Sequence, residues 1–219
     1  EEGTNKIFNY FGEKCIEYTI KRAIKERKLS PYYYYPIQIH LNDDELEEYQ
    51  SITKELTKYY KKKENGELEI NDFGKLLLIK RARIIAAATE KISKLEEIIQ
   101  EYKYDSHILV YCGAATMQDP GYIENKADVM DIRQIEVVSD LLGNKLNMKI
   151  SQFTSSESAE EREILKKEFA EGKHIQALVA IRCLDEGVNI PNIKTAFILP
   201  SSTNPKEYIQ RRGRVLRKA

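Results

Sequence analysis

The sequence is poor in the residues that build metal centres and disulfide frameworks. Its 219 residues include no tryptophan, three histidines and three cysteines, and the cysteines (Cys15, Cys112 and Cys183) form no C-x-x-C pair. Zinc sites and disulfide scaffolds need such residues at short, repeated spacings. We therefore expect no metal site in this chain, and the scattered cysteines are typical of a protein from a reducing cytoplasm.

Net charge and long apolar runs are also absent. The 35 Lys and Arg residues balance 35 Asp and Glu residues, so the formal net charge is +0. A neutral chain is not drawn as a whole to DNA or to an anionic membrane, and any anion binding must be local. The longest apolar runs, such as KLLLIK and IQALVAI, are too short to span a bilayer, and the opening EEGTNKIFNY lacks the pattern of a signal peptide.

A nucleotide-binding loop is missing as well. No G-x-x-x-x-G-K-[ST] sequence occurs, which is the pattern whose backbone amides cradle phosphates. The acidic stretch LDEG lacks the strand that precedes a magnesium-binding carboxylate, and NDDELEE begins a helix. The chain alone is therefore predicted not to hydrolyse ATP.

The first region, residues 1–41, is rich in tyrosine. CIEYTIKRAIKERKL has helical spacing that ends at Ser30-Pro31, and YPIQIHL alternates like a strand. The tyrosine cluster between them could stack on nucleobases. The alternation favours the other interpretation, in which the rings pack against a half-buried strand.

The second region, residues 42–104, is predicted to be a helical hairpin. Asn42 offers an N-cap before ELEEYQSITKELTKYYKKK, and ENGELEIND is the expected turn. One longer amphipathic helix, FGKLLLIKRARIIAAATEKISKLEEIIQEY, is expected to follow. The basic side chains of Lys80, Arg81 and Arg83 on this helix could bind DNA, but the favoured interpretation is that they are solvated.

The third region, residues 105–219, alternates short apolar strands with helices. The strands are HILVYC, KISQF, IQALVAI and TAFILP; the helices lie at about 127–142, in SAEEREILKKEFAEG and in NPKEYIQRR. Apolar strands separated by helices predict an α/β fold with a mainly parallel sheet and helices on both faces, preceded here by the long helical hairpin. Such sheets bind ligands in the loops at the carboxyl ends of their strands.

Three of these loops carry candidate anion-binding residues. Gly113 follows the first strand, and a glycine there lets the backbone approach a phosphate closely. RCLDEGVNIP follows IQALVAI, and TAFILP leads into QRRGRVLR. In QRRGRVLR, Arg214 and Arg217 are spaced to reach one phosphate group from a single face of a turn.

The ordered set of loops resembles the second RecA-like domain of superfamily 2 helicases and translocases. HILVYCGA is similar to motif IV, FTSSESAEEREILKKEF to motif IVa and LVAIRCLDEGVNIP to motif V. QRRGRVLR matches the QxxGRxxR of motif VI at Gln210, Gly213, Arg214 and Arg217. The resemblance covers residues 105–219 and extends weakly upstream toward the XPB-type and restriction-type branch.

The resemblance implies a role for each matching residue. The catalytic arginines would be Arg214 and Arg217, and the ATP-binding residues would be Gly187, Asn189, Gln210 and Gly213. The residues that contact nucleic acid would be Gly113, Thr154, Ile181 and Arg182. Three positions depart from the family: Ile181 replaces a threonine that touches a phosphate, Arg182 replaces an aspartate, and Asn189 replaces an aspartate at the ribose. An asparagine can still hydrogen-bond a ribose hydroxyl.

The implied protein is an ATP-dependent DNA helicase or translocase of repair, restriction or phage defence. Residues 1–41 would be the linker from a first RecA-like domain, 42–104 the helical hairpin and 105–219 the second RecA-like domain. The first domain would bind ATP and Mg²⁺, and this chain would supply the arginines and part of a track for double-stranded DNA. The alternatives are a non-enzymatic nucleic-acid-binding module with the same fold and a protein-interaction scaffold built on the helical pair. The intact Arg214 and Arg217 favour the enzyme.

Overall fold

A computed structural model describes residues 2–12, 15–16, 18–62, 68–113, 134–154, 156–181, 190 and 192–200. The N-terminal half contains α1 (Glu2–Phe11), α2 (Ile20–Lys25), α3 (Asp43–Leu56), η1 (Thr57–Tyr59), β1 (Tyr60–Lys62), β2 (Leu68–Ile70), α4 (Asp72–Ala87), α5 (Glu90–Ile99) and η2 (Gln100–Tyr102). The C-terminal half contains β3 (Ile108–Cys112), a helical stretch over 134–140 that continues into η3 (Leu141–Lys145), β4 (Ile150–Phe153), α7 (Ala159–Glu171), β5 (Ala177–Ile181) and β6 (Thr195–Ile198).

The four strands expected from the sequence form one parallel sheet in the order β4-β5-β3-β6. Strand β3 is central and pairs in parallel with β5 on one side and β6 on the other. All five residues of β3 are fully buried, as expected for a strand covered on both faces. The prediction of an α/β fold with a mainly parallel sheet is confirmed.

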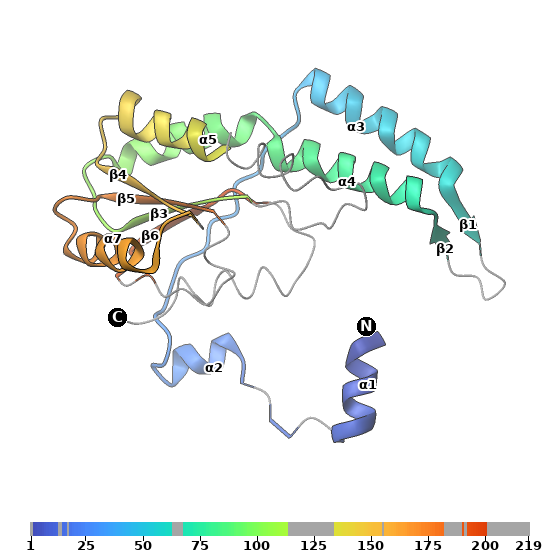
Figure 1. The fold of residues 1–219 in the computed structure, drawn as a ribbon, viewed down its shortest axis with the longest axis horizontal. Coiled ribbons are helices and arrows are strands. Elements are labelled where there is room, and N and C mark those ends of the chain that lie inside the picture. The colour runs from blue at the N-terminus through green and yellow to red at the C-terminus, as the bar shows by residue number, and fades with distance from the viewer. Residues whose placement is uncertain are drawn as a thin grey trace.

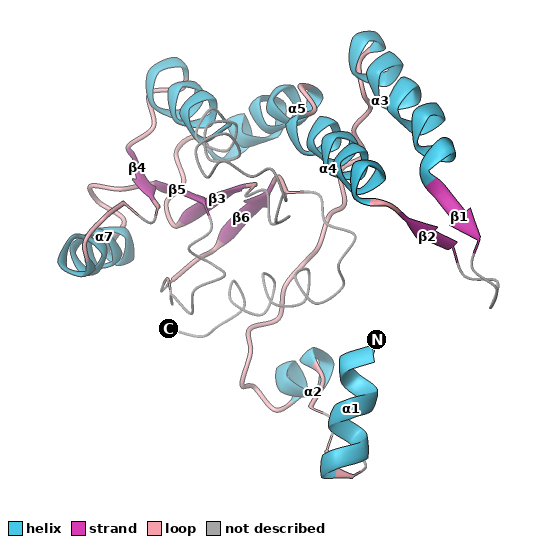
Figure 2. Ribbon diagram, turned by 45° about the vertical axis from the view of Figure 1, so that its right-hand side comes forward, coloured by secondary structure: helices cyan, strands magenta, loops and turns pink. Residues whose placement is uncertain are grey.

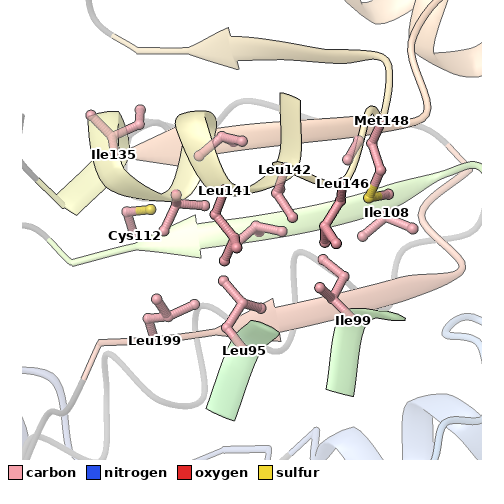
Figure 3. Packing of buried hydrophobic residues seen from close by; sticks show 14 residues of the cluster. Leu95, Ile99, Ile108, Cys112, Ile135, Leu141, Leu142, Leu146, Met148 and Leu199 are labelled. Carbon is pink, nitrogen blue, oxygen red and sulfur yellow. The ribbon is translucent and has the colours of Figure 1, made fainter. Parts of the chain in front are cut away.

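Helices cover both faces of this sheet (Figure 1). Side chains alternate along β3, so Ile108, Val110 and Cys112 join one core cluster while Leu109 and Tyr111 join another. The first cluster also contains Leu95 and Ile99 of α5 and residues from the helical stretch that ends in η3 (Figure 3). The second contains Phe169 of α7. The two core clusters confirm the prediction of helices on both faces of the sheet.

Both ends of α7 are fixed by local sequence. The Ser158 hydroxyl accepts from the Glu161 amide, and the Glu161 carboxylate accepts from the Ser158 amide, which completes a capping box. The helix ends at Gly172, whose φ of 68° is the left-handed conformation that glycine tolerates best. A Cβ added to Gly172 would lie 2.7 Å from His107 Cε1, so glycine is needed there for space as well.

The hairpin differs from the prediction at its turn and in its second helix. Helices α3 and α4 pack through Ile52, Leu56 and Leu77, but β1 and β2 form an antiparallel ribbon between them where a simple turn was expected. The long second helix was predicted to be continuous and is not: Ala88 has a ψ of 124° between α4 and α5. The break turns α5 onto the sheet, where burying its apolar face outweighs helix continuity.

Two of the basic residues on α4 make contacts across the hairpin. Lys80 Nζ lies 2.9 Å from Glu48 Oε1. The Arg81 guanidinium lies 5.4 Å from the centre of the Tyr49 ring and donates to the Thr53 hydroxyl. These side chains therefore join α4 to α3.

The N-terminal region departs furthest from the sequence prediction. The expected helix over CIEYTIKRAIKERKL is limited to the six residues of α2, and α1 was not predicted. The expected strand over YPIQIHL is not formed, and the rings of Tyr33 and Tyr35 are 89% and 76% exposed. The prediction that the tyrosines pack was wrong, because alternation yields a strand only where a neighbouring strand can pair with it. Helices α1 and α2 stand apart from the sheet (Figures 1 and 2).

We predict that Ile99→Ala lowers the free energy of unfolding by about 3 kcal/mol, because Ile99 is fully buried between α5 and the sheet. Ile164→Ala is the matched control, since Ile164 is 55% exposed on α7; it should change stability by less than about 0.5 kcal/mol. Urea denaturation measures both values. Equal effects would contradict the packing of α5 on the sheet.

Candidate functional site

The candidate site lies at the carboxyl edge of the parallel sheet. The register pairs Cys112 of β3 with Ile181 of β5, and Phe153 of β4 with Ala180 of β5. Gly113 and Thr154 directly follow β3 and β4. Because neighbouring strands lie about 4.8 Å apart, the structure brings Gly113, Thr154 and Ile181 together at one edge.

The amide of Gly113 is already engaged within the protein. It donates to Gln134 Oε1 at 2.8 Å. A Cβ added to Gly113 would lie 3.4 Å from the same oxygen and 3.9 Å from Pro200 Cα. The exits of β3 and β6 therefore lie close to Gln134 of the helical stretch. An incoming phosphate would have to displace the Gln134 side chain to reach this amide.

Thr154 is held in the serine-rich turn before α7. Its amide donates to Glu157 Oε2 at 2.6 Å, and its hydroxyl lies 3.0 Å from both oxygens of the same carboxylate. The Arg162 guanidinium donates to the Thr154 carbonyl at 3.1 Å. A phosphate at the Thr154 hydroxyl would meet the negative charge of Glu157, so Arg162 and cations from other loops would have to offset that repulsion.

Ile181 ends β5 half-buried and packs against the core cluster that contains α5. Its side chain stabilises the sheet on that face and carries no group that could hydrogen-bond a ligand. The other predicted site residues lie outside the described residues: Arg182, Gly187, Asn189, Gln210, Gly213, Arg214 and Arg217.

Sequence reasoning missed two polar residues beside this edge. Gln134 Nε2 donates to the Ala86 carbonyl at 3.4 Å, and Lys91 Nζ donates to the same carbonyl at 3.1 Å. Ala86 lies in the last turn of α4, where carbonyls have no partner within the helix. Lys91 and Gln134 therefore cap α4 and connect the hairpin to the exit of β3.

Lys91 is a buried lysine with 7% of its surface exposed. Burial lowers the pKa of its ammonium group from 10.5 to about 8. A sequence signal for this position exists, because Lys91, Leu95 and Ile99 recur at four-residue spacing on one face of α5 and all three are buried.

Two further properties bear on the kind of site. In the described part of the chain, no three His, Cys, Asp or Glu side chains are grouped so that they could hold a metal ion. No helix among the described residues is both long and apolar enough to cross a membrane.

Comparison with known proteins adds a family match. The model of the helicase conserved C-terminal domain matches residues 90–219. The DNA 3'-5' translocase XPB2 of Sulfurisphaera tokodaii is 24% identical over 220 residues, which cover 94% of this chain and 43% of that protein. The ATP-dependent DNA helicase MPH1 of Candida albicans is 26% identical over 221 residues, which cover 99% of this chain and 18% of that protein. The chain thus spans less than half the length of either relative.

Two solved structures are also similar. The Sulfolobus solfataricus SWI2/SNF2 ATPase C-terminal domain aligns with a TM-score of 0.47 at 14% identity, over 73% of this chain and 68% of that chain. The Pyrococcus furiosus Hef helicase domain aligns with a TM-score of 0.39 at 23% identity, over 76% of this chain and 32% of that chain.

We predict that the wild-type chain gains stability relative to Lys91→Met as the pH rises. The unfolded chain keeps the Lys91 proton up to about pH 10.5, whereas the folded chain loses it above about pH 8. The free energy of unfolding therefore rises with pH in that window. Urea denaturation at pH 7 and pH 10 should show the wild type gaining about 2 kcal/mol on the variant.

Lys94→Met is the matched control for this prediction. Lys94 lies on the same helix and pairs with Glu97 at 2.7 Å, which raises the pKa of Lys94. The raised pKa keeps Lys94 charged in the folded chain at pH 10, and the ordinary value of 10.5 keeps it mostly charged in the unfolded chain. The Lys94→Met difference from wild type should therefore change little between pH 7 and pH 10. A constant difference for Lys91→Met as well would show that Lys91 is not desolvated.

Proposed function

Because the chain belongs to the family of helicase conserved C-terminal domains, we propose that it is the second RecA-like half of an ATP-dependent DNA translocase of superfamily 2. The observation that carries the proposal is the convergence of three motif positions on one edge of the sheet: Gly113, Thr154 and Ile181 follow or end neighbouring strands. The names of the two relatives, a DNA translocase and an ATP-dependent DNA helicase, favour DNA as the substrate.

In this proposal the ATP site is shared between two domains. The printed sequence contains no P-loop, so a first RecA-like domain of the same protein would supply it and the residues that hold Mg²⁺. This chain would contribute Gly187, Asn189, Gln210 and Gly213 to the nucleotide-binding face. Arg214 and Arg217 would meet the γ-phosphate and stabilise the charge that develops on it during transfer.

Contact with the DNA backbone would run along the same edge of the sheet. Gly113 and Ile181 would offer backbone groups, Arg182 would offer a guanidinium, and Thr154 would contribute once the charge of Glu157 is offset. Displacing Gln134 from the Gly113 amide would also loosen its bond to the Ala86 carbonyl. DNA binding at this edge would therefore weaken a hydrogen bond at the end of α4. This change would move the hairpin during the ATP cycle.

We predict that the 219-residue chain alone does not turn over ATP, because the printed sequence has no loop to hold the β- and γ-phosphates. A coupled ATPase assay, with and without DNA, measures this. ATP turnover by a preparation free of contaminating ATPase would contradict the proposal that a separate domain supplies the P-loop.

The direct test of the proposed function uses the full protein that joins this chain to a P-loop domain. Arg214→Ala and Arg217→Ala should each lower kcat, and should change KM much less, because the arginines act mainly on the transition state. The loss should be about 3 kcal/mol, by analogy with removal of an oxyanion donor. Arg→Lys should restore little, since an ammonium group cannot reproduce the planar guanidinium.

Arg211→Ala is the matched control, because position 211 is variable in QxxGRxxR. Its kcat should stay within a few-fold of wild type. Wild-type kinetics in all three alanine variants would favour the non-enzymatic nucleic-acid-binding module.

A further inference from the structure

A strongly basic segment surrounds α2 in a chain that is neutral overall. Residues 18–35 contain five cationic residues and one carboxylate, Glu26, which gives a formal charge of 5 − 1 = +4 against +0 for the whole chain. All five cations are exposed: Lys21, Arg22, Lys25, Arg27 and Lys28. This segment therefore presents a local positive field to solvent.

The single carboxylate of the segment is occupied by its neighbours. Glu26 accepts from Arg22 Nε and from the Tyr18 hydroxyl, each at 2.7 Å, and the Arg22 guanidinium lies 5.3 Å from the centre of the Tyr18 ring. The hydrogen bonds from Arg22 and Tyr18 hold the pKa of the Glu26 carboxyl below its usual value. In the part of the chain that the structure describes, none of the other four cations forms a salt bridge with a carboxylate, and Lys28 acts on Glu26 only through its charge at longer range.

Arg27 has a left-handed backbone conformation, which glycine adopts more easily than arginine. Its φ is 58°, and the amides of Arg27 and Lys28 close the end of α2 by donating to the carbonyls of Ile24 and Ala23. This left-handed helix end costs a residue with a side chain roughly 1 kcal/mol. The arginine therefore adds a charge at a position where it does not favour folding.

The tyrosines that follow α2 form the second half of the segment. Tyr33 and Tyr35 are 89% and 76% exposed. Pro31 and Pro36 flank them and favour an extended backbone in the residue before each. A site for single-stranded nucleic acid needs two components: cations that follow the phosphates and exposed rings that stack on the bases. This segment has both.

We propose that residues 18–35 bind single-stranded nucleic acid, at a site separate from the carboxyl edge of the sheet. Lys21, Lys25, Arg27 and Lys28 contact the phosphates, and Tyr33 and Tyr35 stack on the bases. An apolar protein surface that covered the tyrosines would leave the four cations uncompensated. A single-stranded nucleic acid offers phosphates to the cations and base faces to the rings. The site requires no ATP, and it goes beyond the proposed function.

The first test measures fluorescence anisotropy of a labelled oligo(dT) of about 16 nucleotides with the 219-residue chain. Each stacked ring should contribute about tenfold in affinity, or about 1.4 kcal/mol, so Tyr33→Ala/Tyr35→Ala should weaken binding about 100-fold. The dependence of affinity on salt should stay as in wild type, since no charge is removed. Tyr104→Ala is the matched control, because Tyr104 is also 89% exposed but lies outside the segment; it should bind as wild type.

The second test separates charge from stacking. Arg27→Gly removes one phosphate contact, so the slope of log affinity against log salt should become shallower by about 0.7. The variant should be at least as stable as wild type, because glycine suits the left-handed position. Asn147→Gly is the matched control, since Asn147 is exposed with a φ of 54° and carries no charge; it should leave binding unchanged.

The proposal is overturned if wild type does not bind the oligonucleotide at low salt, or if the double tyrosine variant binds as wild type. A loss of affinity in Tyr104→Ala equal to that in the double variant also overturns it. In these cases residues 18–35 are not a single-strand binding site. The binding test is independent of the ATPase test, so failure here leaves the roles proposed for Arg214 and Arg217 intact.

Discussion

Burial of β3 on both faces is the constraint on which the rest of the structure depends. Its five residues are fully inaccessible to solvent, and their alternation supplies the centre of two cores at once. Hydrogen bonds to β5 and β6 fix its register, so the point at which Gly113 leaves the sheet is fixed relative to Ile181 and Pro200. A buried strand cannot slip by one residue without exchanging its two faces. The geometry of the strand-edge loops is therefore a consequence of core packing.

The same strand exit joins the α/β core to the helical hairpin. One series of hydrogen bonds links the Gly113 amide, the Gln134 side chain, the Ala86 carbonyl and the Lys91 ammonium group. Lys91 loses contact with water when it makes its bond, and this desolvation is unfavourable for a cation. The bond to a carbonyl at the helix end offsets part of that cost. Helix α5 is packed in the core, whereas α4 belongs to the hairpin. This series of hydrogen bonds therefore sets the direction in which the hairpin leaves the α/β domain.

Much of the core could be predicted from the sequence, because its signals are local. Apolar runs predicted the four strands, Ser158 and Gly172 marked the ends of α7, and the family match confirms the resemblance drawn from the ordered motifs. The break at Ala88 was missed because alanine itself favours helix, and only tertiary burial of α5 reveals the break. The strand expected at YPIQIHL was wrong because alternation says nothing about a pairing partner. Gln134 bonds to groups 21 and 48 residues away in the sequence, which local periodicity cannot detect. The burial of Lys91 fits the four-residue spacing on α5, but its bond to the Ala86 carbonyl crosses the break at Ala88 that the sequence did not reveal.

Under the proposed function a neutral chain binds a polyanion, so the distribution of its charge along the sequence matters. At the exits of β3, β4 and β5, the described groups are a glycine amide, a threonine beside the Glu157 carboxylate, and an apolar isoleucine. Arg162 adds a positive charge beside Thr154, but the Glu157 carboxylate offsets it. In the proposed function, further attraction would therefore come from Arg182 or from the cations of residues 18–35. In this arrangement, the backbone groups that would position a phosphate and the side chains that would attract it lie in different segments of the chain. Salt would then weaken the attraction and leave the positioning geometry unchanged.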